Sequence, residues 1–406
     1  MLLAVARMLG SQEYGRFASL FGICNLLAFL ALGGQHTFAL KELSAFEIQP
    51  NDGRASWIIR RTASALCAFS IAMLFLIAAC GWVCERWLAE IQLTPRDIIP
   101  VFLLSAFLAS AEYVASVLRA TGSVIPALAP RDVIWRSVSI LSVFYVLSKG
   151  IAASATMAVY MIAIALGTVV LLQILYFVRR FPSGSLLADR QPTTTTWASD
   201  SLWYCLASLA GIFVSHASAS LVLFALDAER AGSFFASQRL SQLLQLPLFG
   251  LNTVLAPHIS RCYHSGDLAG AKAACRKSMK IVLIPTLLLS AVTVLFSPQL
   301  LGLFAEEYRT ASTTLNILVM SSLVFCLTGP TGVIMMMADG HRQAFAQTLI
   351  GEGLGLLLMF PLAVVYGLEG AALAVLFGAT VRGVLAVIWI RRKLKIDPSV
   401  MILFGD

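Results

Sequence analysis

The chain has 406 residues, of which 59% are hydrophobic and only 12% are charged. A soluble chain carries about 25% charged residues, so this composition excludes an ordinary soluble enzyme or binding domain. The net charge of +8 could indicate a nucleic-acid partner. The positions of the basic residues explain the excess differently, as shown below, and we expect no nucleic acid.

Eleven apolar segments alternate with polar loops, and most reach the roughly 20 residues that a helix needs to cross a bilayer. A further apolar segment, Met1–Leu9, is too short to cross. We therefore predict an all-α, polytopic membrane helix bundle. The predicted spans are Tyr14–Gly34, Arg61–Val83, Ile98–Leu118, Ala127–Leu147, Ala155–Phe177, Ser201–Phe224, Gly232–Ala256, Lys280–Phe296, Thr313–Met337, Gln343–Tyr366 and Glu369–Ile390.

The basic residues are sorted by loop: 20 of the 29 Lys and Arg residues fall in every second gap between the segments. Cytoplasmic loops of membrane proteins retain Lys and Arg, so these gaps and the basic C-terminal tail are predicted to be cytoplasmic. An odd number of complete spans then puts the start of Tyr14–Gly34 outside. We interpret Met1–Leu9 as the end of a truncated first helix and expect roughly 10–20 apolar residues to be missing before it.

An internal repeat divides the spans into two sets of six. The string Glu13-Tyr14-Gly15-Arg16-Phe17-Ala18-Ser19 and the string Glu229-Arg230-Ala231-Gly232-Ser233-Phe234-Phe235-Ala236-Ser237 each place a Gly-x-Phe step at the head of a span. Both copies begin on the same side, which indicates parallel repeats. We predict two pseudo-symmetric six-helix lobes, 1–182 and 198–406. The Pro, Gly and Thr residues between them predict a cytoplasmic linker over 183–197.

Motifs for nucleotide, metal or hydrolase chemistry are absent from the sequence: it has no GxxxxGK[ST], HExxH or GxSxG string. The spacing Gly351-x-x-x-Gly355 falls in an apolar segment, where it is typical of close helix packing. We therefore predict a protein that is not an enzyme, with no catalytic residues, metal or cofactor. A membrane enzyme of polysaccharide assembly remains a third interpretation.

Charged and polar residues within predicted spans are the candidate functional residues, because an ionised group there needs a partner or a wet cavity. Glu112 and Arg119 are seven residues apart on one helix face. Arg119 either reaches back to the interface or lines a cavity, and Glu112 is the deeper of the two. His216 near the middle of its span is either a hydrogen-bonded structural residue or a proton or substrate group.

Three more candidates lie in the second half. Arg239 is about two turns into its span, and we expect it to line a central hydrophilic cavity. Glu352 and Arg382 lie in the last two spans and form either a helix–helix salt bridge or part of that cavity. Pro247, Pro285 and Pro330 also fall within predicted spans, where prolines kink helices.

Several motifs resemble those of bacterial polysaccharide flippases, which belong to the multidrug/oligosaccharidyl-lipid/polysaccharide exporter superfamily. The opening string Arg7-Met8-Leu9-Gly10-Ser11-Gln12-Glu13-Tyr14-Gly15-Arg16-Phe17 is similar to their R-x-LG-x-x-EYG-x-F pattern. The second half adds four shorter matches in the family's order. They are Ala236-Ser237-Gln238-Arg239-Leu240, Pro257-His258-Ile259-Ser260, Phe304-Ala305-Glu306-Glu307-Tyr308 and Gly367-Leu368-Glu369-Gly370-Ala371-Ala372-Leu373-Ala374.

The resemblance implies a V-shaped pair of bundles around a central cavity in the bacterial cytoplasmic (inner) membrane. It implies flipping of undecaprenyl-diphosphate-linked oligosaccharide for surface polysaccharide (O-antigen or exopolysaccharide) synthesis, by alternating access. Arg239, with Arg119 at the inner mouth, would compensate the diphosphate charge. The implied partners are the lipid-linked oligosaccharide, membrane lipid, and the polysaccharide polymerase and chain-length machinery.

The alternative is a cation-coupled small-molecule exporter of the same superfamily. Coupling to H⁺ or Na⁺ would predict a site centred on a carboxylate in the first lobe. Glu112 is the only deep acid in that part of the sequence.

Overall fold

A computed structural model describes residues 2–45, 53–83, 95–150, 153–180, 197–226, 228–304 and 306–403 of the chain. These residues form helices and no strand, which confirms the all-α prediction. Six of the described helices are long and apolar enough to cross a membrane, and a seventh span results if the bent pair Leu20–Leu32 and Gln35–Ser44 counts as one. The chain is a multi-pass membrane protein.

The chain forms two compact units, unit 1 (Met1–Cys205) and unit 2 (Leu206–Asp406). The division falls inside α9 (Trp197–Ala225). The predicted linker 183–197 lies outside the described residues except for Trp197. The predicted lobe boundaries therefore stay a prediction.

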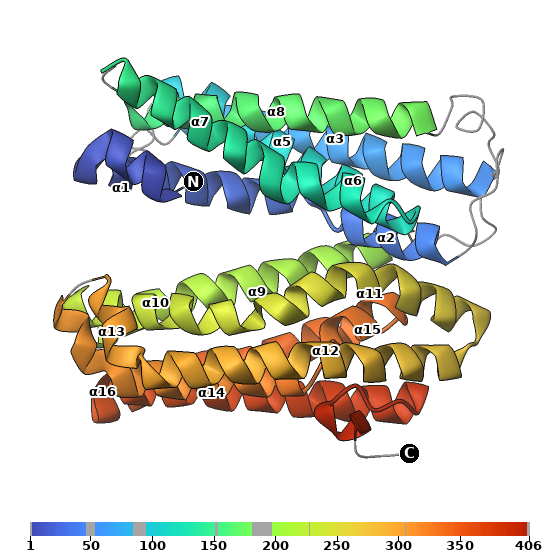
Figure 1. The fold of residues 1–406 in the computed structure, drawn as a ribbon. Helices are drawn as coiled ribbons and strands as arrows, with labels where there is room; N and C mark the ends of the chain where they lie inside the picture. Colours follow the sequence, from blue (N-terminus) through green and yellow to red (C-terminus); the bar gives the residue numbers. More distant parts are fainter. Residues whose placement is uncertain are drawn as a thin grey trace. The chain divides into compact units, whose positions relative to one another are not determined.

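Unit 1 is arranged around one central helix, α5, which packs against α1, α2, α3 and α8 (Figure 1). The bounds of α5 match the predicted span Ile98–Leu118 to within two residues. The helices are α1 (Leu2–Leu32), α2 (Gln35–Ser44), α3 (Gly53–Val83), η1 (Pro95–Asp97), α5 (Ile98–Ala120), α6 (Val124–Ala129), the π-helical η2 (Pro130–Ile134), α7 (Trp135–Ser148) and α8 (Ala155–Arg180).

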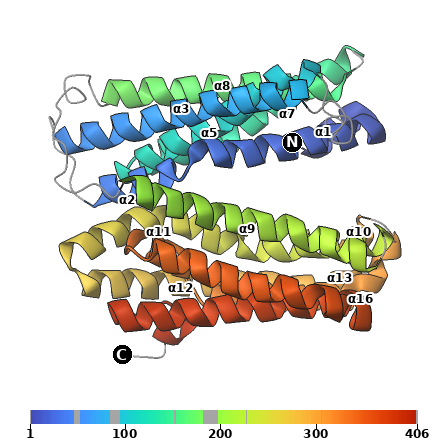
Figure 2. The same cartoon turned by 180° about the vertical axis from the view of Figure 1, so that it is seen from behind.

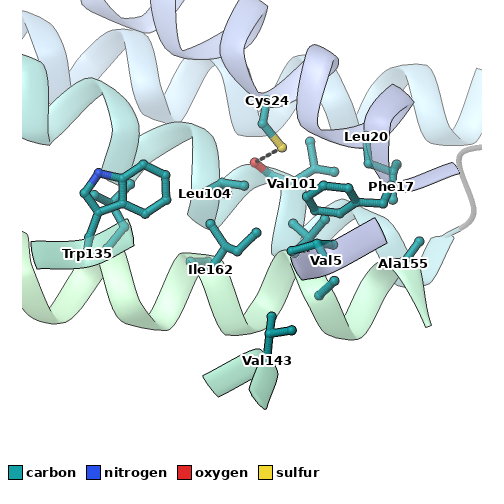
Figure 3. Close-up of a cluster of buried hydrophobic side chains, with 14 of the residues drawn as sticks. Val5, Phe17, Leu20, Cys24, Val101, Leu104, Trp135, Val143, Ala155 and Ile162 are labelled. Carbon is teal, nitrogen blue, oxygen red and sulfur yellow. Dashed lines mark hydrogen bonds between the residues drawn. The ribbon is translucent and has the colours of Figure 1, made fainter. Parts of the chain in front are cut away.

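The core of unit 1 consists of apolar side chains from α1, α5, α7 and α8 (Figure 3). Phe17, Leu20 and Leu104 are fully buried, and Ile162 is 1% exposed. Val5, near the start of α1, lies in the same cluster. These residues form one cluster because each of the four helices turns one apolar face inward.

The start of the chain differs from the prediction in one respect. The sequence predicts a break between Met1–Leu9 and Tyr14–Gly34, but α1 is helical from Leu2 to Leu32. The intervening residues 10–13 contain no proline, and Gln and Glu are good helix formers. A polar interruption of an apolar run is therefore not enough to end the helix.

Two residues of the Glu13-to-Ser19 repeat string hold one end of unit 1 together. Arg16 forms an ion pair of 2.6 Å with Asp97, which is fully buried and also accepts a hydrogen bond from Thr156. Glu13 accepts a hydrogen bond from the backbone N–H of Ala155, at the start of α8. Arg16 thus compensates the Asp97 carboxylate at the start of α5, and the Glu13 carboxylate satisfies a backbone N–H at the start of α8. A carboxylate is favourable at both positions, because the first N–H groups of a helix have no partner within it.

Unit 2 has an analogous central helix, α14, which packs against α10, α12 and α16 (Figure 1). Figure 2 shows α10, α11, α12 and α16 from behind. Besides the rest of α9, it contains α10 (Ala228–Gln242), η3 (Leu243–Gln245), α11 (Leu246–Ser265), α12 (Leu268–Leu295), α13 (Ser297–Gly302), η4 (Glu306–Ala311), α14 (Ser312–Leu327), α15 (Thr331–Met337), α16 (His341–Leu394) and η5 (Val400–Leu403).

The long helix α16 contains both of the last two predicted spans. Its backbone is non-helical at Gly367, with φ 63° and ψ −143°, which separates Gln343–Tyr366 from Glu369–Ile390. Glycine adopts this conformation at little cost because it has no Cβ.

The internal repeat also has a counterpart in packing, since Phe17 and Phe234, at equivalent positions of the two strings, are both fully buried.

The three prolines within predicted spans lie at structurally different positions. Pro247 lies in the first turn of α11, directly after the η3 break, and Pro330 caps α15 after α14 ends. Both mark interruptions of a predicted span. Pro285 lies inside α12, which continues through it.

The C-terminal tail folds back onto unit 2. Ile396 and Ile402 are at most 4% exposed, and η5 packs against α12. The Asp397 carboxylate pairs with Arg391 and accepts hydrogen bonds from the hydroxyl and the backbone N–H of Ser399. Burial alone would raise the pKa of Asp397, but the hydrogen bonds from Ser399 and Arg391 outweigh it, so the pKa lies below its usual value.

Gly329 is where the tail meets the helices. It has φ +81°, and a Cβ there would lie 2.0 Å from the Pro398 carbonyl oxygen. Gly329→Ala should cost about 1–3 kcal/mol, through strain and displacement of the tail. This corresponds to a Tm lower by about 2–4 °C per kcal/mol for a unit of this size. Gly332→Ala is the matched control, since a Cβ there contacts nothing within 4 Å. Equal Tm values would contradict the docking.

The Asp397 contacts predict a pH dependence. Because the folded-state pKa lies below the unfolded value of about 3.9, the stabilisation is complete above that value and is lost as pH falls through the folded pKa. Asp397→Asn should therefore lower the Tm at pH 7, by an amount equivalent to at most about 1 kcal/mol. The difference from the unsubstituted chain should shrink at pH 3. A difference that stays constant would assign the effect to something other than the carboxylate.

Candidate functional site

A cavity of about 610 Å³ lies within unit 1, between α1, α5, η2, α7 and α8. Much of its lining is apolar or aromatic, with a small group of polar and charged side chains. Such a mixture is typical of sites that hold an organic ligand. The polar, charged and indole-bearing lining residues are Asn25, Glu112, Arg131, Asp132, Trp135 and Arg136.

Glu112 is held by two arginines. One carboxylate oxygen lies 3.3 Å from Arg119 Nη2 and the other lies 2.9 Å from Arg131 Nη1. Arg131 also lies 3.5 Å from Asp132, through its Nε. These four side chains, which we call the unit 1 charge cluster, contain two positive and two negative groups. An ionised group in a membrane span needs such compensation.

Arg119 is 7% exposed and folds back along its own helix. Its guanidinium donates to Ser116 Oγ at 2.8 Å and to the Ala115 carbonyl at 3.4 Å, in addition to Glu112. These contacts test neither interpretation of the sequence, an arginine that reaches the interface or one that lines a cavity, and both stay predictions. Arg119 lies behind Glu112, and Glu112 itself lines the cavity.

Arg131 and Asp132 were missed as site residues because the sequence places them at the edge of a predicted span. They lie in η2, a short π-helical turn that starts at Pro130. Proline has no N–H to donate, so the regular α-helical hydrogen bond is lost there. Single π-helical turns are frequent at functional sites, and the adjacent Pro-Arg-Asp string is the sequence feature that could have revealed this one.

His36, at the start of α2, is a second residue that the sequence did not single out. It lies within electrostatic range of Glu112, Arg119 and Arg131. Its Nδ1 is buried and has no hydrogen-bond partner among the described residues, while Nε2 lies 3.1 Å from Thr37 Oγ1. The histidine therefore adds a titratable group beside the cluster.

In unit 2, Glu352 and Arg382 form a salt bridge of 2.9 Å within α16, on either side of the break at Gly367. The Arg382 guanidinium also lies 5.0 Å from the centre of the Phe325 ring. The two arms of α16 approach closely here: a Cβ on Gly351 would lie 2.8 Å from the Gly378 carbonyl oxygen. This confirms the close-packing interpretation of the Gly351-x-x-x-Gly355 spacing.

Arg239 stands apart from these pairs. It is exposed, donates to Gln242 Oε1 at 3.1 Å, and lies 4.7 Å from the centre of the Phe235 ring. His216 lies in α9, but its side chain is outside the described part of the structure. The structure thus brings Glu112 and Arg119 together, and Glu352 and Arg382 together, while Arg239 joins neither pair. Among the described residues, no group of His, Cys, Asp and Glu could hold a metal ion.

Comparison with known proteins shows the fold. Residues 205–365 match the MatE family model. A multidrug resistance MATE family transporter of the MOP superfamily, solved in an outward-facing conformation, superposes with a TM-score of 0.76 at 17% identity, over 97% of this chain and 90% of that one. The chain therefore has the MATE transporter fold.

Two further structures agree. A MATE protein in a straight conformation gives a TM-score of 0.75 at 18% identity, over 97% of this chain and 91% of that one. A Vibrio cholerae MATE transporter in a bent form gives 0.73 at 15% identity, over 94% and 88%. No curated protein matches the sequence.

The charge cluster predicts that Glu112→Gln is strongly destabilising. Removing the carboxylate leaves Arg119 buried without its counter-ion, which should cost about 3 kcal/mol. The control is Glu306→Gln, because Glu306 is 75% exposed and pairs with an exposed Arg309, so its loss should cost under about 1 kcal/mol. The measurement is the Tm of the purified variants in the same detergent. Equal Tm values for the two variants would contradict the pairing.

Proposed function

We propose that the chain is a membrane transporter that works by alternating access. The observation that carries this proposal is the match of nearly the whole chain to solved MATE transporters, one of them described as outward-facing. Transport needs no bond to be made or broken. A protein of this kind is therefore not an enzyme, in line with the absence of catalytic motifs in the sequence.

The comparisons favour the small-molecule exporter as the first candidate function. The family model that matches is MatE, and a solved transporter of the same fold is named for multidrug resistance. The unit 1 cavity has the size and the mainly apolar, aromatic-containing lining that an organic molecule requires. Coupling to a proton or sodium gradient would then involve Glu112 or Asp132, the two acids among the described residues that line this cavity.

A specific observation supports the lipid-linked oligosaccharide flippase as the second candidate. Both oxygens of Glu112 are already bound by arginines, so the carboxylate is not free to bind a cation. Arg136 also lines the cavity, and Arg239 is exposed in unit 2. Exposed guanidinium groups suit a diphosphate, which they bind in a bidentate manner. The motifs that resemble those of polysaccharide flippases agree with this candidate.

One experiment tests both candidates. The chain is expressed in cells that lack their own multidrug exporter, where accumulation of a cationic dye is measured, and in cells that lack their polysaccharide flippase, where surface polysaccharide is measured. Restored dye efflux supports the exporter, and restored polysaccharide supports the flippase. If neither is restored although the protein is present in the membrane, the transporter proposal is wrong for both substrate classes.

The same assays predict the role of Arg239. Arg239→Ala should lower polysaccharide export about tenfold, equivalent to about 1.4 kcal/mol, and should leave dye efflux intact, because a cationic dye gains nothing from an arginine. Arg239→Lys should retain export if charge alone suffices. Arg230→Ala, nine residues earlier in α10, is the control for loss of one positive charge. Unchanged export by Arg239→Ala at equal protein level would remove Arg239 from the transport path.

A further inference from the structure

A second hollow in unit 1 has a polar end and an apolar end. This groove, of about 720 Å³, runs along the first turns of α8 and shares no lining residue with the unit 1 cavity. Its polar end carries Arg16, Arg96 and the hydroxyl of Ser154. Its apolar end carries Met157, Met161 and Ile164.

The apolar end follows one face of α8. Met157, Met161 and Ile164 are spaced by four and three residues, so they lie above one another on the helix surface. From Ser154 to Ile164 the chain rises about 15 Å at 1.5 Å per residue. Ile164 is 65% exposed on α8, a helix that is long and apolar enough to cross the membrane. An exposed isoleucine on such a helix is stable in contact with hydrocarbon.

At the polar end of the groove the arginines are accessible, whereas the neighbouring carboxylates are buried or hydrogen-bonded. Arg96 is exposed and makes no ion pair with another described residue. Arg16 retains 23% side-chain exposure while paired with Asp97. Asp97 is itself fully buried, and one oxygen of Glu13 accepts from the backbone at Ala155. Among the residues that the structure describes, the groove therefore offers a ligand positive charge, chiefly from Arg96.

We propose that this groove binds an anionic phospholipid of the surrounding membrane. The phosphate would lie at Arg96 and Arg16, with the Ser154 hydroxyl as a further donor, and an acyl chain would follow Met157, Met161 and Ile164. Guanidinium groups bind phosphate through paired hydrogen bonds, and basic residues at the membrane surface attract anionic lipids. The site is independent of the transported substrate.

The test uses the full-length protein in nanodiscs or detergent, with bound lipid detected by native mass spectrometry. Phosphatidylglycerol should be retained in preference to phosphatidylcholine. Arg96→Gln should weaken phosphatidylglycerol retention about fivefold, as expected for loss of one basic residue near the surface. Lys149→Gln is the matched control: Lys149 is also exposed, lies in unit 1 at the end of α7, and does not line the groove.

A second pair of variants, one test and one control, probes the apolar end of the groove. Ile164→Gln should lower retention, while Leu171→Gln should not, because Leu171 is 57% exposed on α8 but lies outside the groove. Equal retention in Arg96→Gln and Lys149→Gln, or equal retention of the two lipids, would overturn the proposal. So would full competition by glycerol phosphate, since that outcome would identify a site for a free anion rather than for a lipid.

Discussion

An ionised side chain inside a membrane span must have a partner, and this constraint explains where the charges of the chain lie. Glu112 lies between Arg119 and Arg131, and Glu352 pairs with Arg382. The Glu112–Arg131 pair joins α5 to η2, and the second pair joins the two arms of α16. The pairs therefore fix the relation between helices whose apolar surfaces alone would pack with less specificity. Removing one partner leaves the other buried, which is why such pairs are costly to break.

The need of ionised groups for a partner also explains how the unit 1 cavity is lined. A regular α-helix would continue from α6 into α7, but Pro130 removes a hydrogen bond and a π-helical turn forms. This turn brings Arg131 and Asp132 to the cavity that Glu112 lines. A local defect in one helix is thus stabilised by a charge on its neighbour.

Much of the fold was predictable from the sequence because hydropathy determines which segments span a membrane. Ile98–Leu118 was predicted to within two residues of α5, since its ends are marked by Asp97 and by Arg119. The pairing of Arg131 with Glu112 was not predictable, because it depends on the tertiary position of η2 rather than on helical spacing. The break expected after Leu9 was wrong for a related reason, as a polar string without proline does not by itself end a helix.

A likeness in fold does not identify a substrate, so the substrate must be argued from the site. A carboxylate that couples transport to a cation has to exchange its partners for that cation. Glu112 would have to give up two guanidinium groups at 3.3 and 2.9 Å, and each of these interactions is strong away from water. An anionic substrate meets a comparable cost, because an anion that displaced Glu112 from the arginines would leave that carboxylate without a counter-ion. The charge cluster therefore selects neither a cation nor an anion by its net charge. Arg136 lines the cavity outside this cluster, so it is the guanidinium that an anionic substrate would reach without displacing Glu112.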